Sequence, residues 1–191
     1  MNVRITLAMN GTGPRIAQVT TVDGPLGCSV NSTTFWAGKG RIITIGSISG
    51  ILASRNSGVY SMSKHAIEAF ADSLAAQMAP LGVQVSVIEP GNYNSEIGKS
   101  AAKRLGVDPL FGDRSQYKPP DEVAEAVTQA LFESSPKRRY MVVPNQTEAE
   151  WTIKKAIEQL VQLNEGQAYT YDREAMVRML DEALANARPK R

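Results

Sequence analysis

RIITIGS, residues 41–47, is a short run of apolar and β-branched residues, and this pattern predicts a buried β-strand. A helix is predicted for residues 59–79, because apolar side chains recur there every three or four positions. VQVSVIE, residues 83–89, predicts the next strand, which Pro90-Gly91 ends. A strand, a helix and a strand in succession are typical of a parallel sheet with helices on its faces. The stretch therefore predicts an α/β fold.

The pattern continues toward the C-terminus with one more strand and three more helices. A helix is predicted for 121–134, a strand for 138–143, and helices for 147–163 and 172–187. Thr147 and Glu150 have the spacing of a capping box, and Asp172 is the predicted cap of the last helix. An apolar stripe on the last helix (Met176, Val177, Leu180, Leu184) predicts a core or subunit contact, which could cover a substrate cleft. The basic run at 137–139 is interpreted as a solvated turn.

The composition excludes several classes of protein. The chain has 191 residues, 42% hydrophobic and 21% charged, which is typical of a soluble globular protein of one domain. A net charge of +2 does not favour nucleic acid or a membrane surface as partner. One cysteine excludes an internal disulfide, and one cysteine with one histidine gives no Cys/His metal site. No transmembrane run or signal peptide is evident, so a cytoplasmic location is expected.

Polar residues gather at the ends of the two central strands. Ligands bind at the carboxyl ends of strands in open α/β sheets, and Ser47, Pro90 and Gly91 lie at those ends. Tyr60 and Lys64 begin the intervening helix one turn apart, hence on one face. A cation beside a phenol favours the phenolate, which suits proton transfer to or from a substrate oxygen. The alternative is a surface tyrosine packed along a lysine stem.

The order of these motifs resembles the short-chain dehydrogenase/reductase family over roughly residues 40–145. IGSISG, YSMSK and IEPGNYNS resemble its serine strand, its Tyr-x-x-x-Lys helix and its Pro-Gly motif. The resemblance implies a Rossmann-like sheet and an oxidoreductase that uses NAD or NADP on a small alcohol or carbonyl substrate. It also implies a homo-oligomer, commonly a dimer, through the 59–79 helix.

The same resemblance implies roles for individual residues. Tyr60 would be the general acid/base and would also contact the cofactor, and Lys64 would lower the pKa of Tyr60 and hold the cofactor ribose. Ser47 would position the substrate carbonyl. Pro90-Gly91 would line the nicotinamide pocket, and Ser95 stands where the family often has a threonine that contacts the carboxamide of the nicotinamide.

The sequence departs from the family before residue 40. Only 39 residues precede the serine strand, so the first half of the fold is expected to be missing, and the chain to be truncated or divergent there. Gly11 and Gly13 could mimic the phosphate-binding turn or lie in a flexible loop, and Asn2 or Asn10 could complete the catalytic set. The alternative function is a non-catalytic remnant that acts through protein association, and dinucleotide binding by this chain alone is expected to be weak.

The expected organisation follows from the resemblance and its limits. Residues 1–39 form an irregular or divergent N-terminal segment. Residues 40–145 form the C-terminal half of a Rossmann-like domain that carries the active-site motif, and residues 146–191 form a helical C-terminal extension of the same domain.

Overall fold

The structure of the protein is a computed structural model. It describes residues 15–16, 40–53, 55, 57–97, 100, 103, 106 and 114–187. The chain divides into two compact units, Met1–Thr152 and Ile153–Arg191. Most of the predicted N-terminal segment lies outside the described residues, including Asn2, Asn10, Gly11 and Gly13.

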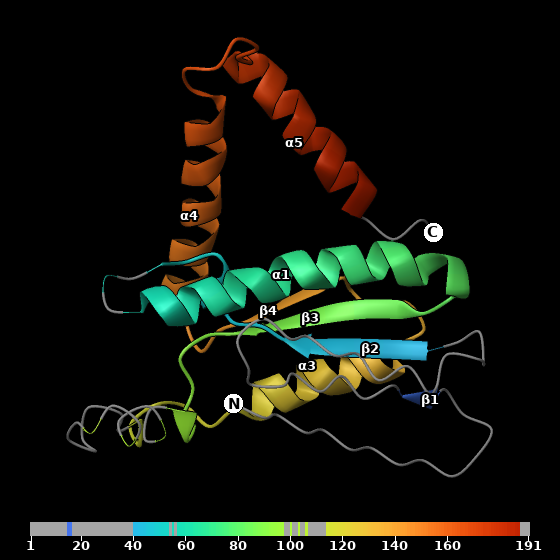
Figure 1. The fold of residues 1–191 in the computed structure, drawn as a ribbon, viewed down its shortest axis with the longest axis vertical. Coiled ribbons are helices and arrows are strands. Elements are labelled where there is room, and N and C mark those ends of the chain that lie inside the picture. The colour runs from blue at the N-terminus through green and yellow to red at the C-terminus, as the bar shows by residue number, and fades with distance from the viewer. Residues whose placement is uncertain are drawn as a thin grey trace. The chain divides into compact units, whose positions relative to one another are not determined.

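The first unit is built on a parallel sheet in the order β1-β2-β3-β4 (Figure 1). Its strands are β1 (Arg15–Ile16), β2 (Gly40–Ile45), β3 (Gln84–Pro90) and β4 (Arg139–Val142). All neighbouring strands pair in parallel, and Ile45 of β2 lies opposite Ile88 of β3. The predicted Rossmann-like parallel sheet is therefore confirmed. The serine strand ends two residues earlier than predicted, which places Gly46 and Ser47 just beyond it.

Helix α1 (Gly58–Met78) covers one face of this sheet, and a 3-10 turn, η3 (Ala79–Leu81), follows it. Its predicted buried face is confirmed, because Leu74 packs with Ile42, Val83 and Val85 in one cluster that Phe70, Ala75 and Met78 border. Gly82 ends η3 with φ 68°, a conformation that residues with a Cβ rarely adopt.

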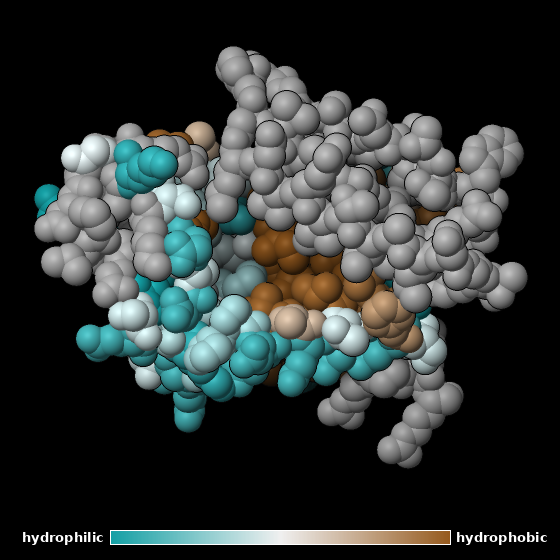
Figure 2. Space-filling view, turned by 90° about the horizontal axis from the view of Figure 1, so that it is seen from below, coloured by the Kyte–Doolittle hydropathy of each residue, from teal (hydrophilic) through white to brown (hydrophobic). Residues whose placement is uncertain are grey.

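Helix α3 (Asp121–Phe132) covers the opposite face, so the sheet lies between two helical layers (Figure 1). Ala126 and Ala130 of α3 pack against Ile88 and Tyr140 of the sheet. The rim of this second cluster is only partly buried. On the face shown in Figure 2, hydrophobic residues gather in a hollow that hydrophilic residues border on one side.

Two helices end the described chain, α4 (Gln146–Asn164) and α5 (Arg173–Ala187). Asn145 Oδ1 accepts a hydrogen bond from the Glu148 amide at 3.0 Å, so Asn145 caps α4 and the predicted Thr147 cap is wrong. The Asp172 cap of α5 is confirmed by its 2.8 Å bond from the Ala175 amide. No residue of α5 is buried, so its apolar stripe is not part of the core among the described residues. No described helix has both the length and the apolar character that a membrane crossing needs.

Candidate active site

Ser47 joins the ends of the two central strands. Its side chain is buried and caps the short 3-10 turn η2 (Ile48–Gly50) by accepting a hydrogen bond from the Ser49 amide at 3.1 Å. The same hydroxyl donates to the Pro90 carbonyl oxygen at 3.3 Å. The serine and Pro-Gly motifs, 43 positions apart in the chain, are thus in direct contact.

Tyr60 and Lys64 lie on the first turns of α1. Tyr60 is 37% exposed, and its hydroxyl makes no hydrogen bond to the described residues. The ammonium nitrogen of Lys64 is 5.6 Å from the centre of the Tyr60 ring and donates to the Ile45 carbonyl oxygen at 3.1 Å. Burial lowers the pKa of Lys64, although the charge of Glu68 opposes this shift. Lys64 therefore connects the helix to the end of β2.

A buried carboxylate holds the Pro-Gly turn from behind. Glu148, in the first turn of α4, is 5% exposed and accepts a hydrogen bond from the Asn92 amide at 2.8 Å. A Cβ added to Gly91 would lie 2.3 Å from Glu148 Oε2, so the carboxylate requires glycine there. The Gly91 amide itself donates to the Val142 carbonyl oxygen at 2.7 Å. Glu148 was not predicted as a site residue, since nothing in the sequence pattern of a surface helix marks it as buried.

The residues after this turn are held by the segment before α3. The Asn94 amide donates to the Lys118 carbonyl oxygen at 2.9 Å, and the Tyr93 hydroxyl donates to Glu122 at 2.5 Å. Burial and the Glu122 carboxylate raise the pKa of Tyr93. Ser95 is exposed and lies beyond these anchors, and no described contact joins it to Ser47, Tyr60 or Lys64.

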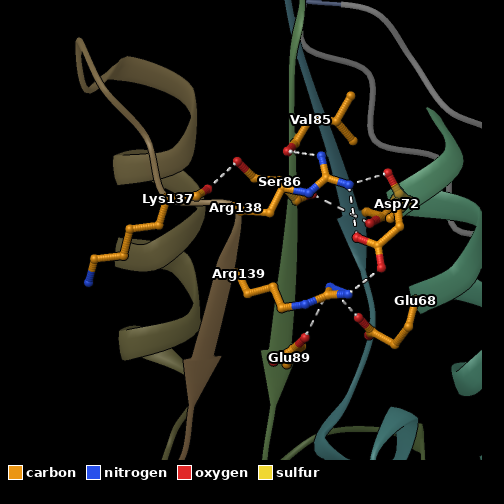
Figure 3. A network of polar contacts seen from close by, with 10 residues as sticks. Glu68, Asp72, Val85, Ser86, Glu89, Lys137, Arg138 and Arg139 are labelled. Carbon is orange, nitrogen blue, oxygen red and sulfur yellow. Dashed lines mark hydrogen bonds and ion pairs between the residues drawn. The ribbon is translucent and has the colours of Figure 1, made fainter. Parts of the chain in front are cut away.

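A second carboxylate, Glu68, lies behind the turn that carries Ser47. A Cβ added to Gly46 would lie 2.7 Å from Glu68 Oε1, and one added to Gly50 would lie 2.9 Å from Glu68 Cγ. Glu68 Oε2 is 2.7 Å from Arg139 Nη1 (Figure 3). The glycines on both sides of Ser47 therefore make room for a side chain from α1.

Arg138 and Arg139 form an ionic network with α1, so the interpretation of residues 137–139 as a solvated turn is wrong for both arginines. Arg138 donates to the Ala71 carbonyl oxygen at 2.7 Å and to Asp72 at 3.0 Å. Arg139 donates to Asp72 at 2.8 Å besides Glu68 (Figure 3). Both arginines are half-buried, because β4 starts inside the network.

Glu89 is the most deeply buried acid of this network. It is 2% exposed and directly precedes Pro90, and its Oε1 atom is 3.7 Å from Arg139 Nη1. Burial, together with the nearby Glu68 carboxyl, raises the pKa of Glu89 to about 7, against the effect of Arg139. The sequence feature that could have identified Glu89 is its position, since it is a charged residue near the end of an otherwise apolar strand.

The structure brings Ser47, Lys64 and Pro90 together through hydrogen bonds at the ends of β2 and β3, with Tyr60 one turn away on α1. His65 is exposed, and its Nδ1 lies 2.9 Å from the Ser61 carbonyl oxygen of its own helix.

Comparisons with known proteins agree with this arrangement. Residues 19–106 match the sequence model of a family described as short chain dehydrogenase. The uncharacterized oxidoreductase YbbO of Escherichia coli K12 is 30% identical over 109 residues, which are 55% of this chain and 40% of YbbO. Mouse retinol dehydrogenase 5 is 40% identical over 84 residues, 44% of this chain and 26% of that enzyme.

A solved structure shares the fold. The short-chain dehydrogenase from Streptomyces avermitilis superposes with a TM-score of 0.54 at 21% identity, over 71% of this chain and 53% of that one. The chain thus spans less than half the length of the two curated relatives and about half of this structural neighbour.

Proposed function

We propose that the chain, which is similar to the short-chain dehydrogenase family over residues 19–106, is an NAD(P)-dependent oxidoreductase that interconverts an alcohol and a carbonyl compound. The observation that carries the proposal is the hydroxyl of the partly exposed Tyr60, which has no hydrogen-bond partner among the described residues and lies one helical turn from Lys64. Lys64 in turn binds the end of β2, which Ser47 joins to the end of β3. A phenol and a cation at the carboxyl edge of a parallel sheet are suited to proton transfer at a bound substrate.

The described residues fit the nicotinamide-ribose end of a dinucleotide. Lys64 uses one N–H on the Ile45 carbonyl oxygen and keeps two for ribose hydroxyls. The Pro90-Gly91 turn presents backbone without a side chain at Gly91, where a flat ring could approach. Ser95 would contribute a hydroxyl to the same end. When bound, the nicotinamide accepts or donates the hydride, and the protein supplies orientation and charge.

The proton would move at the Tyr60 hydroxyl. Tyr60 donates it to the carbonyl oxygen during reduction and accepts it from the alcohol during oxidation. The ammonium nitrogen of Lys64 is 5.6 Å from the centre of the Tyr60 ring, so a positive charge lies beside this proton transfer. The Ser47 hydroxyl turns from Pro90 toward the substrate oxygen and orients it, because a hydroxyl can rotate to suit a new partner.

We also infer that two copies associate through α1. Its outer face carries exposed apolar and small residues, among them Val59 at 80% and Met62 at 67% exposure. Such side chains are more favourable against a second helix than in water.

Replacement of Tyr60 by phenylalanine tests the proposed function. The substitution keeps the ring and removes only the proton, so turnover should fall by about 10²- to 10⁴-fold. The assay follows NADH or NADPH absorbance with 2,3-butanedione and benzaldehyde as carbonyl probes. Tyr169→Phe is the matched control, because Tyr169 is also exposed and belongs to the second compact unit, Ile153–Arg191.

Undiminished turnover in Tyr60→Phe would exclude Tyr60 as the acid/base. Absence of turnover by the unmodified chain with both cofactors and a broad set of carbonyl compounds would count against the oxidoreductase itself.

A further inference from the structure

The carboxyl pair of Glu68 and Glu89 lies behind all three motifs of the candidate site. Glu68 belongs to α1, one helical turn after Lys64, and fills the space left by Gly46 and Gly50 on either side of Ser47. Glu89 directly precedes Pro90 at the end of β3. A change in this pair therefore reaches the serine turn, the tyrosine helix and the Pro-Gly turn at once.

The pair lacks hydrogen-bond donors for two of its oxygens. Oε1 of Glu68 and Oε1 of Glu89 are both buried, and neither accepts a hydrogen bond from the described residues. Both carboxyl groups lie at the same nitrogen, Arg139 Nη1, which is 2.7 Å from Glu68 Oε2 and 3.7 Å from Glu89 Oε1. Two ionised carboxylates cannot hydrogen-bond to one another, whereas one proton between them makes one group a donor and the other its acceptor.

The surrounding charges do not neutralise both acids. Arg139 from β4 is 2.7 Å from Glu68 but 3.7 Å from Glu89, and it also pairs with Asp72 of α1. Arg138 pairs with Asp72 and with backbone carbonyl oxygens. Lys64 donates to the Ile45 carbonyl oxygen instead of either acid. Ile42 and Thr44, the described residues of β2 on this face, carry no charge, and neither does Gly46 just beyond the strand.

We propose that Glu68 and Glu89 share one proton and that the protonated pair is a positioning device, which holds the backbone around Ser47 for the proposed reaction. Glu68, beside Arg139, is the acceptor, and Glu89 is the donor. Loss of the proton leaves two negative charges beside the one Arg139 nitrogen that they share. Glu68 has no free space toward Gly46 or Gly50, so the repulsion displaces the turn that carries Ser47.

The pH dependence follows from the state of Glu89. Its pKa in the fold is about 7, above the usual value of 4.5. The folded state therefore holds a proton that the unfolded chain has lost between these two values. The stability that this proton contributes is fully present below about pH 4.5 and is lost as the pH rises through about 7.

Replacement of Glu89 by glutamine tests the shared proton without any assay of activity. Glutamine keeps the shape and a donor N–H but cannot ionise, so the variant should gain melting temperature relative to the unmodified protein as the pH rises from 5 to 8.5. Glu125→Gln, which removes an exposed carboxylate from α3, is the matched control and should show no such trend. Parallel melting curves for Glu89→Gln and the unmodified protein would overturn the shared proton.

A second measurement covers the case in which Glu89→Gln does not fold. Carbon-13 NMR of the side-chain carboxyl groups in the unmodified protein should show one glutamate that titrates near pH 7. Titration of all glutamates below pH 5.5 would equally overturn the proposal.

Hydrogen exchange tests the positioning role. After correction for intrinsic exchange, amides 46–52 of the unmodified protein should lose protection by about tenfold between pH 6 and 8, because a midpoint near 7 changes the protonated fraction by about that factor. Glu89→Gln should keep its protection at both values. Equal exchange in the two proteins at pH 8 would overturn the positioning role.

The role of the carboxyl pair in the reaction rests on the proposed oxidoreductase function. Measurements of turnover distinguish a failure of one proposal from a failure of the other. If the chain reduces carbonyl probes, the turnover of Glu89→Gln relative to the unmodified protein should rise severalfold between pH 6 and 8.5. A flat ratio would contradict the role of the pair in the reaction. If no protein turns over but the exchange result holds, the oxidoreductase proposal fails and the carboxyl pair stands.

Discussion

At the scale of single residues, Ser47 has a structural role and a proposed role in the reaction. Its hydroxyl caps η2 and joins β2 to the Pro90 carbonyl oxygen, which are structural contacts. The same hydroxyl is the group that would orient a substrate oxygen. No described histidine is placed to activate it as a nucleophile, because His65 contacts the carbonyl oxygen of Ser61.

Ser47→Ala should therefore lower both stability and turnover. Loss of a cap and a buried hydrogen bond costs about 1–2 kcal/mol of the free energy of unfolding. Ser86→Ala is a matched control, since Ser86 is also buried and donates to a backbone carbonyl oxygen, that of Lys137 at 2.7 Å. Chemical denaturation and steady-state kinetics of both variants give the comparison.

The control should lose similar stability and keep its turnover. If Ser86→Ala slows the reaction as much as Ser47→Ala, the effect of Ser47 is one of stability alone. Labelling of Ser47 by a serine-directed acylating reagent would indicate a hydrolase-like site instead.

At the scale of secondary-structure elements, local sequence patterns predicted which strands and helices form. Features that depend on backbone geometry or on contacts between distant residues were not predicted. The strand at residues 41–47 and the helix at 59–79 carry their own periodicity, so both were predicted within two residues of their bounds. The predicted cap of α4 was wrong because Asn145 and Thr147 both have side chains that can cap a helix. Backbone geometry determines which of the two residues does so.

The site was predicted as far as short motifs define it. Ser47, Lys64 and Pro90 meet because parallel strands end at one edge. The buried acids next to these residues were not predicted. Glu68 and Arg139, for example, are 71 positions apart, and no local sequence pattern indicates that they pair. Glu148 reaches the Asn92 amide across 56 positions for the same reason.

The contact between α4 and the Pro-Gly turn leads to a prediction about Gly91. Gly91→Ala should destabilise the protein by about 1–3 kcal/mol, because the new methyl group and the Glu148 carboxylate cannot occupy the same space. Gly58→Ala is the control, since a Cβ at this first residue of α1 meets nothing within 4 Å and should not destabilise. Urea unfolding followed by circular dichroism measures both.

A double mutant identifies the cause. Glu148→Ala alone leaves the Asn92 amide without its partner and should also destabilise. Gly91→Ala combined with Glu148→Ala should cost less than the sum of the two, with a coupling of about 0.5–3 kcal/mol. Simple additivity would mean that Val143 and Pro144, the next-nearest neighbours, cause the strain.

At the scale of the whole molecule, α1 connects the site to the surface. Its inner face carries Glu68, Ala71 and Leu74, and its first turns carry Tyr60 and Lys64. The outer face is free of charged residues along one stripe of exposed positions: Val59, Met62, Ala66, Ala69, Ser73 and Ala76. Positions three and four apart form one face, and the 21 residues of α1 extend about 30 Å. Small side chains on such a face allow a second helix to approach closely.

Ala69→Glu should therefore dissociate a dimer formed through α1. Ala69 lies in the middle of the stripe, so the new carboxylate would be desolvated at the centre of the contact without a partner. Light scattering during size-exclusion chromatography measures the mass, with twice the chain mass of 20.7 kDa expected for the unmodified protein and the chain mass for the variant. Ala124→Glu, the same change at an exposed position of α3, controls for the added charge and should remain dimeric. Elution of the unmodified protein as a monomer would contradict association through α1. So would an Ala69→Glu variant that stays dimeric with its helical content intact.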